Sequence, residues 1–400
     1  MKIGILREEK VPTDKRVPLS PNQCKRLIAQ YPSIVLFVQS SNIRCFQDSE
    51  YEDLGINIEE DISDCDVFLG IKEVPIESLI ADKTYLFFSH TLKKQDYNRA
   101  LLQDMLVKRI KMVDYEVIKN TNGKRLLGFG RYAGIIGAYN GLLTYGLKSE
   151  KYKLKAAHLC ENREEIEREL QKLNLSNKKI ILTGNGRVGQ GALETLRKAK
   201  IREASKEEFV NETFEETVFV HLNTMDYNAR IDGTGFNKFE FYNQPEFYIS
   251  CFMDYAKHAD IFIAGHYYSE GSPYLITKED VKKSTFKIIT VADISCDING
   301  PIACTIRSSE IETPIYGYSP ITEKEDNFTK EGVIAVMAVD NLPSELPKEA
   351  SEDFGKNLLE NIFPLLIHED TDGIIENAII CQNGNLMPDF EYLTEYLNGL

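Results

Sequence analysis

The chain has 400 residues, which is enough for two domains with separate hydrophobic cores. Its composition, 42% apolar and 27% charged without low-complexity tracts, is that of a globular protein, and no apolar run is long enough to span a membrane. A formal net charge of -15 argues against a nucleic-acid-binding surface, although it leaves room for a local basic pocket that binds an acidic metabolite.

The first residues and the cysteines bear on the cellular compartment. The sequence MKIGILREEK has acidic residues too early, and an apolar run too short, for a secretory signal. The eight cysteines are scattered without a C-x-x-C pair, which favours reduced core residues over a disulfide framework or a zinc site. We therefore expect a cytoplasmic protein.

Short apolar strands alternate with helical stretches in the first third of the chain. Strands are expected at 2–6, 33–39, 67–72, 85–90 and 110–116, with helices at 18–31 and 95–108. Such alternation indicates βαβ units and a mostly parallel sheet, so the fold class is α/β. The following helical stretch, 130–148, is rich in glycine, and Gly134 and Gly137 indicate close packing against another backbone.

The stretch 178–198 (KKIILTGNGRVGQGALETLRK) combines an apolar strand, a glycine turn and an amphipathic helix. The turn carries Gly184, Gly186 and Gly189 in a G-x-G-x-x-G pattern. Strand, turn and helix in this order are typical of dinucleotide binding, because the helix N–H groups and dipole favour the pyrophosphate. A glycine-rich turn without a ligand is the alternative interpretation.

A dinucleotide site also needs a group that holds the ribose, and an acidic residue is expected roughly 20 residues after the turn. The candidates there are Glu203, Glu207 and Glu208. Arg202 and Lys206 stand among them, so the choice between NAD and NADP stays open.

Further strands are expected at 218–223, 259–265 and 286–295, as in the later part of a dinucleotide-binding sheet. The polar and aromatic segment 223–254 lacks clear periodicity and is interpreted as an insertion. An amphipathic helix at 349–367 would return the chain to the first domain. We expect a discontinuous first domain, 1–132 plus 350–400, and a dinucleotide-binding domain, 133–349.

Ionisable residues follow several of the expected strands, where parallel sheets bind their ligands. Lys72 and Glu73, then His90, then Glu116 come after three strands, and Arg16 follows the first strand after a loop. Burial would lower the pKa of a lysine toward neutrality, and a lysine and a histidine together can run proton transfers. A surface lysine, a structural histidine and a salt-bridged arginine are the alternatives.

In the second domain, Asp293 and Asp297 close the strand ITVADISCD, where they would face a nicotinamide or its ribose. An acidic loop is the plain alternative. The remaining histidines lack metal-ligand spacing, so no metal is expected. They are His158, His221, His258, His266 and His368.

Several motifs in a fixed order resemble the alanine dehydrogenase and lysine-forming saccharopine dehydrogenase superfamily, with its lysine–ketoglutarate reductase branch. The pieces span nearly the whole chain. They are LREEKVPTDKRVPLSP (6–21), LGIKEVP (69–75), KTYLFFSHTLKKQ (83–95), IKMVDYE (110–116), GFGRYAGIIGAYN (128–140), ITVADISCDINGPI (289–302) and AVDNLPSELPKEAS (338–351).

The resemblance implies two Rossmann-like domains with an active-site cleft between them. It implies reductive condensation of lysine with 2-oxoglutarate, using NAD or NADP. Lys72 would be the catalytic base and His90 the acid–base, and Arg16 would bind a substrate carboxylate. The remaining implied substrate residues are Glu73, Lys93, Glu116 and Arg125. The cofactor residues would be Gly184, Gly186, Arg187, Val188, Gly189, Asp293, Asp297 and Asn341.

Two other classes of function are weighed against this one. An alanine dehydrogenase-like enzyme would use the same lysine and histidine to make alanine from pyruvate and ammonia. A non-catalytic dinucleotide-binding protein would lack Lys72 or His90, and both are present. The partners expected are small molecules, an amino acid and a 2-oxoacid, rather than nucleic acid or membrane. The sequence leaves open whether the chain forms a homo-oligomer.

Overall fold

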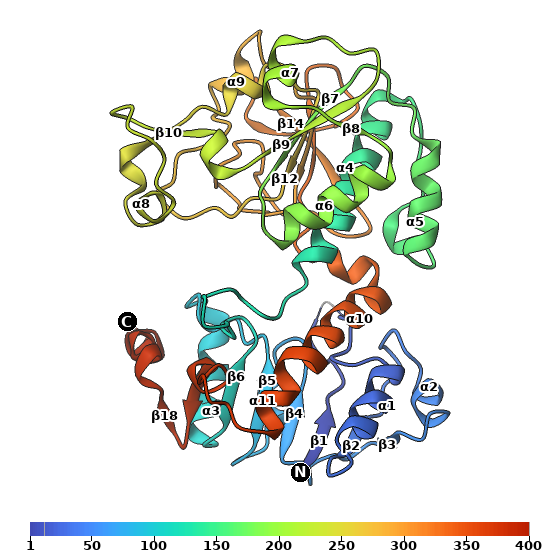
Figure 1. Cartoon of the computed structure of the whole chain (residues 1–400), viewed down its shortest axis with the longest axis vertical. Helices are drawn as coiled ribbons and strands as arrows, with labels where there is room; N and C mark the ends of the chain where they lie inside the picture. Colours follow the sequence, from blue (N-terminus) through green and yellow to red (C-terminus); the bar gives the residue numbers. More distant parts are fainter. Residues whose placement is uncertain (12, 400) are drawn as a thin grey trace. The chain divides into compact units, whose positions relative to one another are not determined.

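The structure is a computed structural model that describes residues 1–11 and 13–399. Its chain divides into two compact units, one of Met1–Phe129 with Pro347–Leu400 and one of Gly130–Leu346. In Figure 1 the first unit is coloured blue to cyan and red, and the second green to orange. Among the described residues, no helix is long and apolar enough to cross a membrane.

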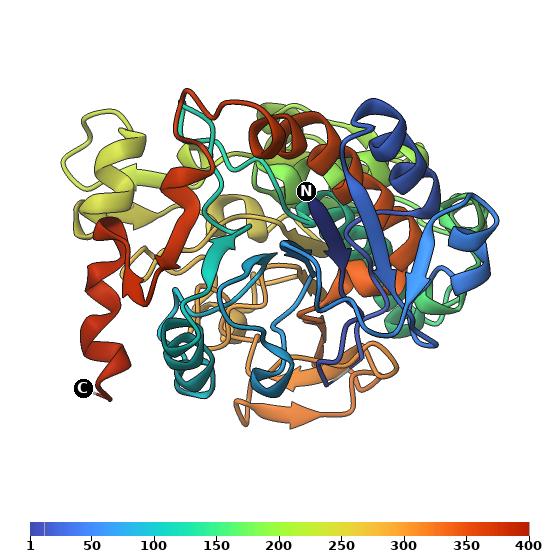
Figure 2. The ribbon, with the colours of Figure 1, turned by 90° about the horizontal axis from the view of Figure 1, so that it is seen from below.

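The first unit is built on a sheet with the strand order β18-β17-β6-β5-β4-β1-β2-β3. The strands are β1 Lys2–Ile5, β2 Val35–Gln39, β3 Asn57–Glu59, β4 Val67–Leu69, β5 Thr84–Phe87, β6 Lys111–Asp114, β17 Ile379–Gln382 and β18 Asn385–Leu386. Strands β1 to β6 are parallel, whereas β17 and β18 extend the sheet antiparallel beyond β6. Figure 2 shows dark-blue β1 beside blue β2. The strand order reverses between β1 and β4, where α/β sheets bind ligands.

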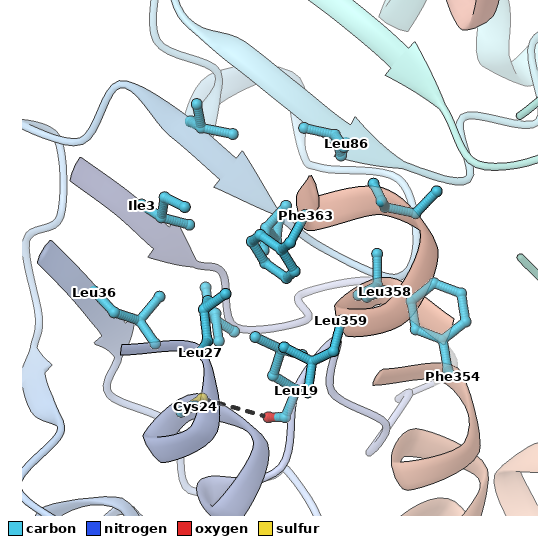
Figure 3. Close-up of a cluster of buried hydrophobic side chains, with 14 of the residues drawn as sticks. Ile3, Leu19, Cys24, Leu27, Leu36, Leu86, Phe354, Leu358, Leu359 and Phe363 are labelled. Carbon is cyan, nitrogen blue, oxygen red and sulfur yellow. Dashed lines mark hydrogen bonds between the residues drawn. The ribbon is translucent and has the colours of Figure 1, made fainter. Parts of the chain in front are cut away.

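Helices surround this sheet, and the C-terminal segment completes its core. They are α1 Pro21–Gln30, α2 Asp48–Glu52, α3 Arg99–Val107, α10 Pro347–Asn357, a π-helical turn Leu358–Ile362, α11 Phe363–Ile367 and α12 Thr394–Leu397. Leu358 and Phe363 lie in one buried cluster with Ile3 and Leu86 of the sheet (Figure 3). The π-helical turn comes just before Pro364, a residue without the N–H that a regular helix needs.

The second unit has a sheet with the order β15-β14-β16-β13-β12-β7-β9-β8. The strands are β7 Lys179–Thr183, β8 Arg202–Glu203, β9 Val218–Leu222, β12 Ile261–Ala264, β13 Thr290–Asp293, β14 Ile315–Ser319, β15 Lys324–Asp326 and β16 Ile334–Met337. All are parallel from β16 to β8, and β14 and β15 form an antiparallel edge. The two sheets confirm the α/β class expected from the sequence.

Helices and a small hairpin accompany the second sheet. The helices are α4 Gly130–Ser149, α5 Arg163–Glu169, α6 Arg187–Lys198, α7 Lys206–Asn211, α8 Lys238–Asn243 and α9 Met253–Ala256. Strands β10 Asn228–Arg230 and β11 Tyr248–Ser250 pair antiparallel, apart from the main sheet, with α8 between them in sequence. This hairpin and helix occupy the segment in which the sequence showed no periodicity.

The long helix α4 packs directly on α6, which follows the glycine turn. A Cβ at Gly134 would lie 1.9 Å from the carbonyl oxygen of Val188, far inside van der Waals contact. The two backbones can approach only because this position has no side chain. The close packing against a backbone that the sequence indicated is therefore confirmed at Gly134, whereas a Cβ on Gly137 would meet the side chains of Ile294 and Leu342.

Candidate functional site

The carboxyl ends of neighbouring parallel strands carry the ionisable residues of the first unit. Strands β4 and β5 pair in register up to Leu69 and Leu86. The N–H of Phe88 then donates to the carbonyl of Ile71 at 3.0 Å. Lys72 and His90 follow this last inter-strand bond by one and two residues, so the sheet brings their backbones close together.

Glu73 holds the imidazole of His90. Nδ1 of His90 donates to Glu73 Oε1 at 2.7 Å, and Lys10 Nζ donates to the same carboxylate at 2.6 Å. Burial acts to raise the pKa of Glu73, but the hydrogen bonds from His90 and Lys10 outweigh it and lower that pKa to about 2. Because the ionised carboxylate can only accept at Nδ1, Nε2 is the ring atom left to exchange a proton with a ligand.

The loop that carries His90 is anchored by Asp114 at the end of β6. Its carboxylate accepts from Ser89 N–H at 3.0 Å and Ser89 Oγ at 2.5 Å, and from the N–H of Glu116 at 2.7 Å. Burial raises the pKa of Asp114 to about 6. His90 itself has a φ of 51°, in the left-handed region that side chains other than glycine rarely adopt. The surrounding hydrogen bonds hold this conformation in place.

The loop that carries Lys72 is held by Glu8, which follows β1. The Glu8 carboxylate accepts the N–H groups of Ile71 at 2.6 Å and of Lys72 at 2.8 Å. Burial, and then the charge of Asp14, raise the pKa of Glu8 to about 8. Burial, and then the positive charge of Arg16, lower the pKa of Lys72. Lys72 therefore gives up its proton more readily than a surface lysine.

Arg16 is buried and paired with Asp14. Its Nε and Nη2 donate to the two oxygens of Asp14 at 2.9 and 2.5 Å, and its guanidinium carbon lies 4.1 Å from the centre of the Phe129 ring. Burial acts to raise the pKa of Asp14, but the charge and hydrogen bonds of Arg16 lower it to about 2. Two of the five guanidinium N–H groups are thus committed to Asp14.

Three further expected residues also belong to the first unit. Arg125 Nη2 donates to Glu116 at 2.8 Å, in a pair that is partly open to solvent. Lys93 lies on the exposed loop that follows His90. Glu8, Asp14 and Lys10 were not singled out from the sequence.

The glycine turn of the second unit borders a pocket of about 730 Å³ at the carboxyl ends of β7, β9 and β12. Its lining residues are Gly184, Asn185, Gly186, Arg187, Val188, Asn223, Thr224, Met225, Phe236, Lys238, Tyr242, Gly265, His266 and Tyr267. Gly184 has a φ of 95°, and a Cβ on Gly189 would lie 1.9 Å from the carbonyl oxygen of Gly184. A Cβ on Gly186 would meet no atom within 4 Å, so open space lies above the turn at the start of α6. A pyrophosphate fits such a cradle.

The order of the strands places the three glutamates considered as ribose ligands away from the glycine turn. The strand beside β7 is β9, and β8 lies outside β9 with Glu203 opposite Phe219, near the start of β9. The three glutamates considered from the sequence do not line the pocket. The first residue after the strand beside β7 is Asn223, which does line it. Sequence order misled here because the strand that follows α6 is not the neighbour of β7.

The expected aspartates of the second unit lie outside the pocket lining. Asp293 is 1% exposed and accepts from Thr305 Oγ1 at 2.7 Å and from the N–H of Cys296 at 3.1 Å. Burial raises its pKa to about 6. Asp297 is half-buried on the following loop, and Asn341 precedes the 3₁₀ turn Leu342–Glu345.

His266 at the end of β12 is a pocket residue that sequence reasoning did not assign to the site. It is 6% exposed, and Nδ1 lies 2.8 Å from Thr183 Oγ1. Burial lowers its pKa to about 4, so the imidazole is neutral at neutral pH. Its position directly after an apolar strand is the signal that could have identified it.

Sequence comparisons agree with this architecture. The family described as "Alanine dehydrogenase/PNT, N-terminal domain" matches residues 4–136. Alpha-aminoadipic semialdehyde synthase of Arabidopsis thaliana is 29% identical over 98% of this chain and 41% of its own length, and the mitochondrial protein of Rattus norvegicus is 28% identical over 98% and 47%. The chain thus spans less than half the length of these two relatives. Saccharopine dehydrogenase [NAD(+), L-lysine-forming] of Yarrowia lipolytica is 25% identical over 90% of this chain and 91% of its own.

Solved structures show the same fold. L-alanine dehydrogenase superposes with a TM-score of 0.67 at 15% identity, covering 99% of this chain and all of the other. Transhydrogenase from Sinorhizobium meliloti gives a TM-score of 0.61 at 14% identity, covering 98% and all of the other chain. The protein is an α/β protein with two Rossmann-like sheets. Its sequence resembles the alanine dehydrogenase and saccharopine dehydrogenase superfamily over residues 4–136 and, in the comparison with its relatives, over most of the chain, in line with the resemblance of its motifs.

Proposed function

We propose that the protein is an NAD(P)-dependent oxidoreductase acting on CH–NH bonds, which joins L-lysine and 2-oxoglutarate reductively to form saccharopine. The observation that carries the proposal is the pair Lys72 and His90, held at the ends of adjacent strands by Glu8 and Glu73. The similarity to a lysine-forming saccharopine dehydrogenase over most of both chains supports the substrate class.

The proton transfers of this reaction suit the two side chains. Lys72, with its lowered pKa, would take the proton from the substrate amine so that nitrogen can attack the 2-oxoacid carbonyl. His90 would exchange protons through Nε2 with the carbinolamine oxygen as water leaves, because Nδ1 is bound to Glu73. Arg16 would bind a substrate carboxylate while Asp14 holds its other side.

The second unit would supply the cofactor. Gly184, Gly186, Arg187, Val188 and Gly189 would hold the pyrophosphate of NAD or NADP, as the open space above Gly186 allows. The bound nicotinamide would supply the hydride that reduces the imine. Asp293, Asp297 and Asn341 would serve its nicotinamide end. We assign substrate binding to the domain expected at 1–132 plus 350–400, and cofactor binding to the domain expected at 133–349. Hydride transfer then requires that the substrate on the first domain and the cofactor on the second come into contact.

The test is a substrate assay on the purified chain. NADPH and NADH oxidation is followed by absorbance with lysine plus 2-oxoglutarate, and separately with pyruvate plus ammonia, and products are identified by mass spectrometry. Oxidation that depends on both lysine and 2-oxoglutarate, with saccharopine as product, is the expected result. Alanine formation instead would establish the alanine dehydrogenase activity, and no oxidation with either pair would overturn the proposal.

We also propose a cytoplasmic location, which all eight cysteines, present as free thiols, support. Fluorescence microscopy of the tagged chain in its own cell tests this, and an organellar signal would contradict it. Light scattering after size exclusion determines whether the chain forms a homo-oligomer, which a monomer mass would rule out.

A further inference from the structure

The segment between β10 and β11 forms one wall of the pocket beside the glycine turn. Phe236, Lys238 and Tyr242 from this segment line the pocket. Phe236 packs on Tyr248 of β11, with ring centres 5.4 Å apart. The ring centres of Tyr242 and of Tyr267, which follows β12, lie 6.0 Å apart. The wall is therefore an ordered part of the second unit.

A network of an ion pair and a hydrogen bond connects the helix α8 to the two strands of the hairpin. Arg230 of β10 donates to Glu240 of α8 at 2.9 Å, and Tyr248 Oη donates to the same carboxylate at 2.5 Å. Glu240 is thus paired and is not among the residues that line the pocket. Lys238, two residues earlier on the same helix, lines the pocket and is exposed to solvent.

The lining has a distinct chemical character. Arg187 and Lys238 bring positive charge, and aromatic rings come from Phe236, Tyr242 and Tyr267, whereas no lining residue among those described carries a carboxylate. Tyr267 is 74% exposed, as expected for a flat apolar face that a ligand covers. A site with cations and without a carboxylate favours a phosphate over a ribose hydroxyl at the adenosine end.

Two buried polar atoms beside this wall have no hydrogen-bond partner among the described residues. They are Oδ1 of Asn223 and Nε2 of His266, and both residues line the pocket. Buried polar atoms are normally paired, and a ligand bound in this pocket would supply partners for them. Asn223 directly follows β9, the neighbour of β7, where a dinucleotide fold places the ribose.

We propose that the segment Phe236–Tyr242 forms the adenosine end of the cofactor site, with Lys238 as the ligand of a ribose 2′-phosphate. The inference rests on the proposed dinucleotide binding and gives a function to part of the segment that the sequence analysis interprets as an insertion. The adenine ring lies against the aromatic wall, and the cation selects NADP over NAD.

Direct binding tests this without catalysis. The chain has no tryptophan, so the fluorescence of bound NADPH or NADH is measured free of an indole background. We expect wild-type protein to bind NADPH more tightly than NADH. Lys238→Gln should raise the Kd for NADPH about tenfold and that for NADH less than about twofold, since one charge-assisted bond to the phosphate is lost. Lys287→Gln, on an exposed lysine outside the pocket, is the matched control and should change neither.

Two fragments separate the phosphate from the rest of the cofactor. Adenosine 2′,5′-bisphosphate should displace NADPH from wild-type protein at lower concentration than 5′-AMP, and Lys238→Gln should remove that advantage. Tyr242→Leu should weaken NADPH and NADH by similar factors, because both carry adenine, with an unchanged melting temperature showing that the unit folds.

Equal Kd values for NADPH and NADH in wild-type protein would overturn the inference while leaving dinucleotide binding intact. The same holds if Lys238→Gln leaves NADPH binding unchanged or weakens both cofactors alike. If neither cofactor binds the wild-type chain, the proposed function fails first. The two failures are therefore distinguishable.

Discussion

Nδ1 of His90 donates a hydrogen bond to Glu73 at 2.7 Å, and this contact determines which imidazole nitrogen can serve the reaction. Lys10 binds the same carboxylate, so Glu73 is ionised throughout the range in which the enzyme would work. The pair orients a side chain whose backbone already occupies a sparsely populated conformation. The orientation of the His90 ring therefore depends on Glu73, while Asp114 holds the loop that carries it.

Glu73→Gln keeps the size of the side chain and removes its charge. We expect kcat to fall about tenfold or more, with a smaller change in KM, because the imidazole loses the partner that fixes its tautomer. Steady-state kinetics with varied lysine and 2-oxoglutarate measure this. Glu9→Gln is the control, since Glu9 pairs with Arg7 at 3.0 Å, away from His90. An unchanged kcat in Glu73→Gln would rule out the positioning role.

Lys72 and His90 should carry the proton transfers. Lys72→Met and His90→Gln are each expected to lower kcat by about a hundredfold or more, the usual loss when a general acid or base is removed. Lys25→Met, the same change on the exposed side of α1, should leave turnover intact. Circular dichroism confirms folding of each variant. Full turnover in either site variant would show that the reaction centre lies elsewhere.

The buried carboxyl of Glu8 should make stability fall as pH rises. Its folded-state pKa of about 8 lies above the unfolded value of 4.5, so the folded protein binds the extra proton between these values. The stabilisation is complete below about pH 4.5 and is lost as pH rises through about 8.

Urea unfolding of wild type and Glu8→Gln at several pH values checks this. The difference in unfolding free energy, wild type minus variant, should decrease by a few kcal/mol between about pH 5 and 8. Effects of other groups cancel in that difference. A difference that does not change with pH would mean that Glu8 is ionised in the folded protein.

Two glycines near the cofactor turn should separate stability from binding. Gly134→Ala places a methyl group against the backbone of Val188 and should destabilise the second unit by roughly 2 kcal/mol or more. Gly186→Ala meets no protein atom, so it should leave the melting temperature nearly unchanged while weakening NADPH binding through the occupied cradle. Calorimetry and NADPH fluorescence measure the two effects. Normal NADPH binding by Gly186→Ala would exclude the turn as the pyrophosphate site.

Much of the fold could be predicted because strands and helices differ in hydrophobic period. The strand ends were placed too late: the apolar run 67–72 ends as a strand at Leu69, and 85–90 ends at Phe87. Ile71 stays buried beyond the strand because Glu8 binds its N–H, a contact between residues 63 positions apart. The hydrophobic periodicity of a short stretch of sequence does not reveal such a contact.

Lys72 and His90 could be identified as candidates from the sequence because each comes three residues after the end of a strand. Residues that act through others were missed. Glu8 and Asp14 look like solvent-exposed loop acids in sequence, and only the structure shows that they are buried and bind the Lys72 N–H and Arg16. Asn223 was not considered as a ribose ligand because the spatial neighbour of β7 is the second strand after it in the chain, β9.

The first unit draws its core from both ends of the polypeptide. Ile3 and Leu86 pack with Leu358 and Phe363, and β17 pairs with β6. During synthesis, Gly130–Leu346 is translated before those closing residues. The segment translated first must therefore wait, with an apolar sheet face uncovered, until its neighbour in the chain has been made, and that interval is when a chaperone would be most needed.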